Sequence, residues 1–252
     1  MFYAQNAETR SSGESTDSGG KKWEFDIRPY AWLLNMDGHI TGKGHRTKLD
    51  YDLSDILDDL EWGGSLKGEI KRGKFGVFVD LIIGELSRDG KVGPISADVD
   101  VDITLVEFGA FYRWIDRDVK FLGGRRLTTE PYIGGRWVDI DSDVKIKFPM
   151  GAEKISPDQD WLDLIIGSRT TLQLGPKWQL KMENNIGGFD IGDSSDFSRE
   201  STLLFGRDMT KKSTFLFGYR YLDIDYDHGS GVDEFKWDAS ISGPMVAVNI
   251  HL

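Results

Sequence analysis

Charged residues recur at alternate positions in several segments, a spacing that places them on one face of a β-strand. Lys67, Glu69 and Lys71 form one such row, and the opposite face is apolar. A face with both charge signs could line a hydrophilic pore or a solute pocket, or form a buried network of mutually neutralising ions. We favour the network, and the two can coexist. The candidate lumen-lining residues are Lys67, Glu69, Lys71, Asp80, Glu107, Arg113, Arg136, Asp163, Arg169, Lys181, Glu183 and Arg220.

Aspartates alternate near the ends of three predicted strands, in the rows Asp98, Asp100, Asp102; Asp139, Asp141, Asp143; and Asp223, Asp225, Asp227. Alternate carboxylates could bind Ca²⁺ or Mg²⁺ and bridge phosphates. Asp223, Asp225 and Asp227 are the weak candidates for such a metal site. The chain has no twelve-residue Ca²⁺-binding loop, and solvated loop ends are the simpler interpretation. We therefore predict no metal site and no cofactor.

Catalytic chemistry has few candidates, because the chain has only 4 histidines. His228 follows Asp225 and Asp227, so it could act as a general base in a hydrolase. No nucleophile motif accompanies it. We therefore predict a protein without enzymatic activity and keep the hydrolase as an alternative.

Period-two alternation dominates from Trp23 onward, which predicts an all-β domain over residues 22–252. The polar, Gly- and Ser-rich residues 1–21 are predicted to be a disordered leader or the remnant of a signal peptide. Residues 38–52 are either a further strand or part of a long first loop. The predicted strands are 23–36, 61–72, 75–87, 97–114, 129–146, 159–174, 178–190, 197–208, 213–227 and 235–252.

One segment has helical periodicity. Leu53, Ile56, Leu57 and Leu60 are spaced i, i+3, i+4 and i+7, and Ser54 is the expected N-cap. The spacing predicts a short amphipathic helix near 53–60, in a loop or plugging one end of the domain.

Tight polar turns at 72–74, 115–118, 175–177 and 209–212 alternate with longer acidic connections at 87–97, 147–159, 190–196 and 228–234. Short turns at one rim and long loops at the other are typical of antiparallel up-and-down transmembrane β-barrels. We predict about 10 strands, within a range of about 8 to 12.

The sequence favours an outward apolar face and an inward charged face. Aromatic residues stand beside the tight turns, where an interfacial girdle would lie, and include Phe75, Trp114, Trp178 and Phe215. Glycines share the charged face, where they would make room for long side chains. The alternative is a soluble β-barrel in which Phe75, Val77, Val79 and Leu81 line a cavity for a small apolar ligand.

Composition limits the partners. The formal charge of −11 argues against nucleic acid, and the absence of cysteine removes disulfides and thiolate metal sites. No stretch reaches the roughly 20 apolar residues of a membrane-spanning helix, so the chain would cross a bilayer only as a closed barrel.

The C-terminal row Val246, Val248, Ile250 and Leu252 resembles the last-strand assembly signal of outer-membrane barrels, although Leu252 replaces the usual terminal aromatic residue. The segments 27–33, 53–60 and 74–81 also resemble a family of largely uncharacterised, porin-like proteobacterial outer-membrane proteins. The resemblance implies export through the periplasm to a Gram-negative outer membrane, with lipid, lipopolysaccharide and the barrel-assembly machinery as partners. The function expected is a structural barrel or a narrow passive channel for a small polar solute.

Overall fold

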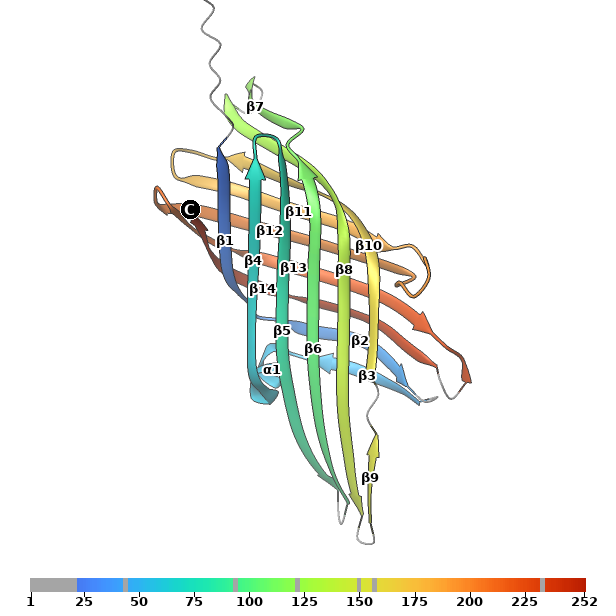
Figure 1. The fold of residues 1–252 in the computed structure, drawn as a ribbon. Helices are drawn as coiled ribbons and strands as arrows, with labels where there is room; N and C mark the ends of the chain where they lie inside the picture. Colours follow the sequence, from blue (N-terminus) through green and yellow to red (C-terminus); the bar gives the residue numbers. More distant parts are fainter. Residues whose placement is uncertain are drawn as a thin grey trace, which may run out of the picture.

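The computed structural model describes residues 22–42, 45–92, 95–120, 123–148, 151–155, 158–231 and 234–252. Ten antiparallel strands form a barrel that closes where the first strand pairs with the last (Figure 1). This confirms the predicted architecture; the predicted leader, residues 1–21, lies outside the described residues. The wall strands are β1 (Trp23–Trp32), β4 (Leu60–Arg72), β5 (Phe75–Val92), β6 (Ile95–Tyr112), β8 (Arg125–Phe148), β10 (Asp158–Gln173), β11 (Trp178–Gly188), β12 (Phe197–Thr210), β13 (Ser213–His228) and β14 (Phe235–His251).

The first predicted strand, 23–36, is divided in the structure. β1 ends at Trp32, and β2 (Asn35–Gly42) continues beside the next part of β14. β2 then turns back into β3 (His45–Tyr51), so the ambiguous segment 38–52 is largely a hairpin. The division lies at Leu33, whose N–H donates to the Pro244 carbonyl at 2.8 Å.

Several predicted connections are strand. β5 and β6 pair as far as Val92 and Ile95, and β8 forms a hairpin with β9 (Gly151–Ile155), so most of 87–97 and 147–159 is extended. The expected turn at 115–118 is β7 (Ile115–Val119), paired with the start of β8. Gly123 and Gly124 both have positive φ, a conformation that glycine adopts without strain, and the connection therefore turns there.

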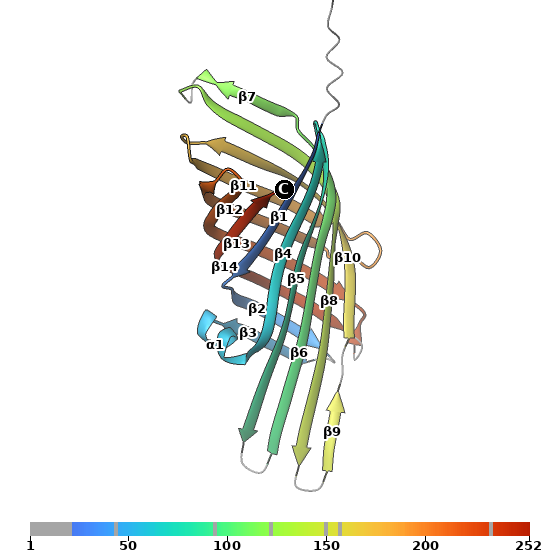
Figure 2. The same cartoon turned by 60° about the vertical axis from the view of Figure 1, so that its left-hand side comes forward.

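The predicted helix is α1 (Leu53–Asp59). Its N-cap is Asp52 rather than Ser54: the Asp52 carboxylate accepts from the backbone N–H groups of Ser54 and Asp55, and Asp55 completes a capping box. Ile56 is buried, while Leu57 is exposed. α1 lies between the β2–β3 hairpin and β4, at the side of the barrel rather than across its end (Figures 1 and 2). None of the described residues forms a helix long and apolar enough to span a membrane.

The two faces of the wall are those of a membrane barrel. Apolar side chains such as Val79, 50% exposed, and Leu164 and Phe217 point outward around the barrel. We call this outward surface the apolar band. Phe75, Val77 and Val79 are exposed on it, so the alternative of a soluble barrel with these residues inside is wrong. The expected girdle residues Phe75, Trp114, Trp178 and Phe215 are exposed as well.

The inside of the barrel changes character along its axis. Towards the rim with the long connections, a buried cluster includes Leu105, Val138, Trp161, Leu222 and Tyr226. The Trp161 and Tyr226 rings stack with centroids 4.3 Å apart. Towards the rim at which β1 begins and β14 ends, the inward side chains are largely charged. The half of the interior towards the long connections is therefore apolar, and the half towards the start of β1 is ionic.

Candidate functional site: a charged septum inside the barrel

Arg136 on β8 is fully buried at the upper end of the ionic region. Its guanidinium lies 2.7 Å from Glu107 on β6 and 3.1 Å from Glu200 on β12. It also donates to the side-chain amide oxygen of Asn185 and to the Ser198 hydroxyl. Parity on each strand points these side chains inward, and the circular closure of the sheet brings them together.

Arg220 on β13 links this group to the next one. It lies 3.0 Å from Glu200, 3.8 Å from Glu107 and 3.7 Å from Asp80 on β5. Tyr30 on β1 accepts from Arg220 at 3.0 Å and donates to Asp80 at 2.7 Å. The ion pairs therefore cross the lumen.

The chain of ion pairs continues towards the tight turns. Lys67 lies 3.8 Å from Asp80 and 2.5 Å from Glu183, and Arg28 lies 3.3 Å from Glu183. Arg169 then lies 2.7 Å from Glu69, which is also 3.9 Å from Arg28. We call these ten residues the charged septum: Arg28, Lys67, Arg136, Arg169 and Arg220 with Glu69, Asp80, Glu107, Glu183 and Glu200.

The charged septum is balanced in charge and largely buried. It contains five cations and five carboxylates from nine of the ten wall strands, and no side chain in it is more than 13% exposed. Desolvating so many charges is costly, and it is offset only when each ion has close partners. Loss of one partner therefore leaves an uncompensated charge in the lumen.

Aromatic rings support the inner side of the charged septum. The Arg169 guanidinium lies 4.0 Å from the Phe111 ring centroid and 5.5 Å from that of Phe78. A Cβ at Gly76 would lie 2.2 Å from the Phe111 ring. The sequence suggested that inward glycines make room for long charged side chains. Gly76 instead makes room for the Phe111 ring.

Two cavities lie on opposite sides of the charged septum. The vestibule, about 150 Å³, opens near the tight turns and is lined by charged residues such as Asp26, Lys71 and Lys181. The wall cavity, about 240 Å³, lies in the apolar half beside α1. The two share no lining residue, and Lys67 and Asp80 stand between them on β4 and β5.

The structure places all twelve sequence-predicted lumen residues on the inward face, and eight of them belong to the charged septum. Arg113 pairs with Glu130 beside the vestibule, and Lys71 pairs with Asp26. Asp163 instead accepts from the Ser195 backbone N–H and from the hydroxyls of Ser195 and Ser198.

Arg28 and Glu200 are two septum members that sequence reasoning missed. Arg28 shares the inward face of its strand with Asp26 and Tyr30, and Glu200 shares that of its strand with Ser198 and Thr202. The two-residue repeat alone could therefore have found both. On β12 the outward row is interrupted by Arg199 and Ser201, which hides the alternation, whereas the outward row of β1 is regular.

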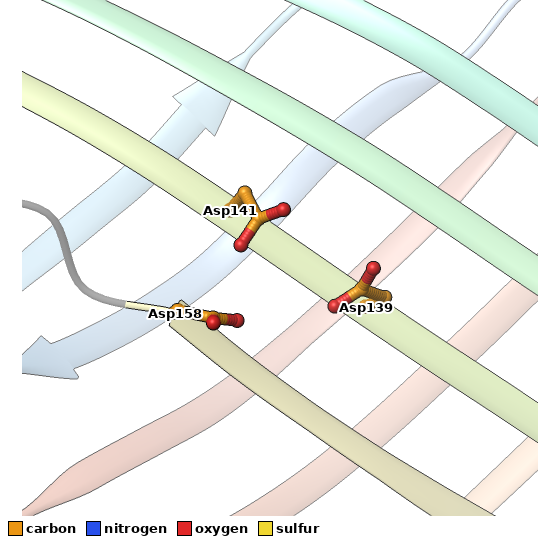
Figure 3. A group of neighbouring side chains, drawn as sticks. All are labelled: Asp139, Asp141 and Asp158. Carbon is orange, nitrogen blue, oxygen red and sulfur yellow. The ribbon is translucent and has the colours of Figure 1, made fainter.

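The structure does not gather the candidate metal residues Asp223, Asp225 and Asp227. Asp223 lies 2.9 Å from Arg199, and Asp227 lies 2.7 Å from Lys236. Within the described residues, the carboxylates that could share a cation are those of Asp139, Asp141 and Asp158, with oxygen atoms within 4.8 Å of one another (Figure 3).

Asp139 and Asp141 project from β8 and Asp158 from the start of β10, and Asp141 stands directly opposite Asp158 (Figure 3). A hydrogen bond with Asp158 raises the pKa of the Asp141 carboxyl, and the neighbouring negative charges act in the same direction. The group is largely exposed, and such groups are common without a metal ion.

His228 is half exposed at the end of β13. Its Nδ1 lies 3.9 Å from the exposed Asp193 carboxylate, and its ring stacks on Tyr226. Its neighbour Asp227 is already paired with Lys236. On the last strand, Val246, Val248 and Ile250 lie outward on the apolar band, and Leu252 is exposed at the end of the chain.

No family model matches the chain, and no curated protein matches it. Several solved structures align with the barrel over most of its length. The outer membrane protease OmpT of Escherichia coli aligns with a TM-score of 0.54 and 7% identity, over 92% of this chain and 97% of that one. The translocator domain of autotransporter NalP from Neisseria meningitidis gives 0.41 and 13%, over 93% and 90%. A major outer membrane protein from Thermus thermophilus gives 0.37 and 14%, over 92% and 100%. The alignment with OmpT, at a TM-score of 0.54, shows that the chain has the fold of an outer-membrane β-barrel.

Proposed function

We propose that this protein is a non-enzymatic β-barrel of the Gram-negative outer membrane whose lumen is sealed. The charged septum is the observation that carries this proposal. It favours a structural membrane protein over an open channel. The charged side chains that fill the lumen pair with one another, so they are not available to bind a solute.

The physical barrier lies at Lys67, Asp80 and Arg220. A hydrated ion moving between the vestibule and the wall cavity would have to separate these buried partners. Separating them would leave buried charges without close partners, which is costly in a poorly solvated interior. Passive flow through the resting barrel is therefore expected to be negligible.

A narrow channel is the second candidate, and the vestibule is the observation that favours it. Its lining carries both charge signs and is open enough to accept a small polar solute at the inner rim. Passage would require the charged septum to rearrange.

The partners proposed for this function follow from the outer surface. The apolar band suits membrane lipid, and the acidic ends of β6 and β8 lie where lipopolysaccharide would be met through bridging cations. Val246, Val248, Ile250 and Leu252 are proposed as the assembly signal. No catalytic role is proposed for His228, and replacing it with alanine should change no lipid or peptide hydrolysis.

Conductance across a planar lipid bilayer tests the proposal. The full-length protein should give no steady ionic steps. The double variant Lys67→Ala/Asp80→Ala removes a neutral pair from the charged septum and should conduct. The matched control Arg126→Ala/Asp116→Ala removes an exposed pair at the rim and should stay silent. Steady conductance by the unmodified protein would overturn the sealed barrel and favour the channel.

A further inference from the structure

The barrel wall is interrupted on one side. β4 pairs with β1 only from Ser65 onward, because Tyr30 and Ser65 are the last partners in that register. β1 then continues as β2, which pairs with β14, while β3 pairs with β2. Within the described residues, β3 and the first part of β4 are therefore not joined by a ladder. α1 lies across this gap (Figure 2).

The backbone holds the gap open. Leu33 at the β1–β2 division donates to Pro244, so the chain follows β14 away from β4. A Cβ at Gly243 would lie 1.9 Å from the Leu33 carbonyl oxygen. Glycine at 243 thus permits the close approach on which the division depends.

The wall cavity lies at this gap and passes through the wall. Ile82 and Leu105 line it from inside the barrel, while Ile83 and Gly64 line it from the outward face. Ile56, Leu57 and Leu60 cover it from α1 and its C-terminal end. Its lining is overwhelmingly apolar, and an apolar cavity of about 150 Å³ already stays dry and takes up benzene.

The wall cavity ends at the charged septum, and apolar side chains surround its opening. Tyr30 and Trp32 line it at the edge of the charged septum, where Arg220 lies 4.9 Å from the Trp32 ring centroid. Immediately next to the opening, Leu66 and Val79 belong to the apolar band. The material outside the opening is thus the hydrocarbon that surrounds the band.

We propose that the wall cavity binds one acyl chain of a lipid from the surrounding bilayer, admitted sideways between α1 and β4. The end of the acyl chain lies against Ile82 and Leu105, and the headgroup of the lipid stays outside the wall. The site goes beyond the sealed barrel, since it needs no passage through the charged septum, and the conductance result leaves it untouched.

Photo-crosslinking tests the site without any variant. The full-length protein is placed in vesicles of phosphatidylethanolamine that carry a diazirine near the end of one acyl chain, and labelled peptides are mapped. A chain in the cavity labels the inward residues Ile82 and Leu105, which lipid around the barrel does not reach. Labels confined to outward residues such as Val79 and Phe108 would overturn the proposal.

Gly64→Phe should block the site. A Cβ there meets nothing within 4 Å, and the new ring would occupy the opening. Gly68→Phe is the matched control: it is on the same strand and face, has equal space, and lies outside the cavity. Inward labelling should vanish in the first variant and persist in the second, with both barrels intact on gels. Equal inward labelling in both would contradict the proposal; if Gly64→Phe does not fold, the labelling of the unmodified protein decides.

Discussion

At the scale of single residues, the central feature is charge buried inside the barrel. Arg136 is fully buried between Glu107 and Glu200, whereas Arg126, whose side chain is 61% exposed, pairs with Asp116 at the rim. The geometry of the two pairs is similar, with shortest distances of 2.7 Å in each. Their energetic value should nevertheless differ, because solvent screens only the exposed pair.

Arg136→Ala is expected to destabilise the barrel by about 3–5 kcal/mol, because it leaves two carboxylates without their shared cation. Arg126→Ala is the control and should cost less than about 1 kcal/mol. Equilibrium unfolding by urea in detergent measures both. Equal, small losses for the two variants would mean that the Arg136 network does not stabilise the folded barrel.

At the scale of elements, alternation is the property that each strand contributes. Val77, Val79 and Leu81 face outward on β5, while Phe78 and Asp80 face inward. The same alternation carries β6 and β8 far beyond the apolar band, where aspartates replace the outward apolar residues. α1 is the exception, and its Asp52 cap fixes where the helix begins.

Val79→Arg is expected to impair assembly, since a cation on the lipid face near the bilayer midplane costs about 2–4 kcal/mol. Ile191→Arg is the matched control: Ile191 is 62% exposed in the connection between β11 and β12, outside the apolar band. The yield of folded protein in lipid vesicles is the measurement. Normal assembly of Val79→Arg would show that the outward face does not contact lipid.

At the scale of the whole molecule, closure makes the fold cooperative. β14 pairs with β13 on one side and with β1 and β2 on the other, so the last strand joins both ends of the sheet. The charged septum then ties nearly every wall strand across the lumen. Because the first and last wall strands pair with each other, closure removes the free edges that these two strands would otherwise present.

Mobility in SDS gels tests closure. Unboiled protein should migrate differently from boiled protein, because a closed barrel resists the detergent. Val246→Pro removes a ladder hydrogen bond at a position paired with both β1 and β13, and this variant should lose the difference. Met209→Pro, at the irregular register near the end of β12, should keep it. Soluble protein without a mobility difference would be inconsistent with the membrane barrel.

The sequence by itself determined the local properties: strand alternation, the number of wall strands, the inward face of Lys67 or Arg169, and the helix that begins at Leu53. These depend on the two-residue repeat of a strand and the 3.6-residue repeat of a helix, which neighbouring residues specify. Small local errors, such as the cap at Asp52, came from the competition between nearby capping residues.

Only the tertiary structure decided which charges meet. Arg28 and Glu183 are 155 positions apart, and they pair because closure fixes the register of every strand against its neighbours. Alternation tells which face a residue occupies but leaves its height in the barrel undefined. The charged septum across the lumen, the grouping of Asp139, Asp141 and Asp158, and the gap between β3 and β4 all depend on that height. The barrel could therefore be predicted from the sequence, whereas its charged septum and its wall cavity form only when the sheet closes.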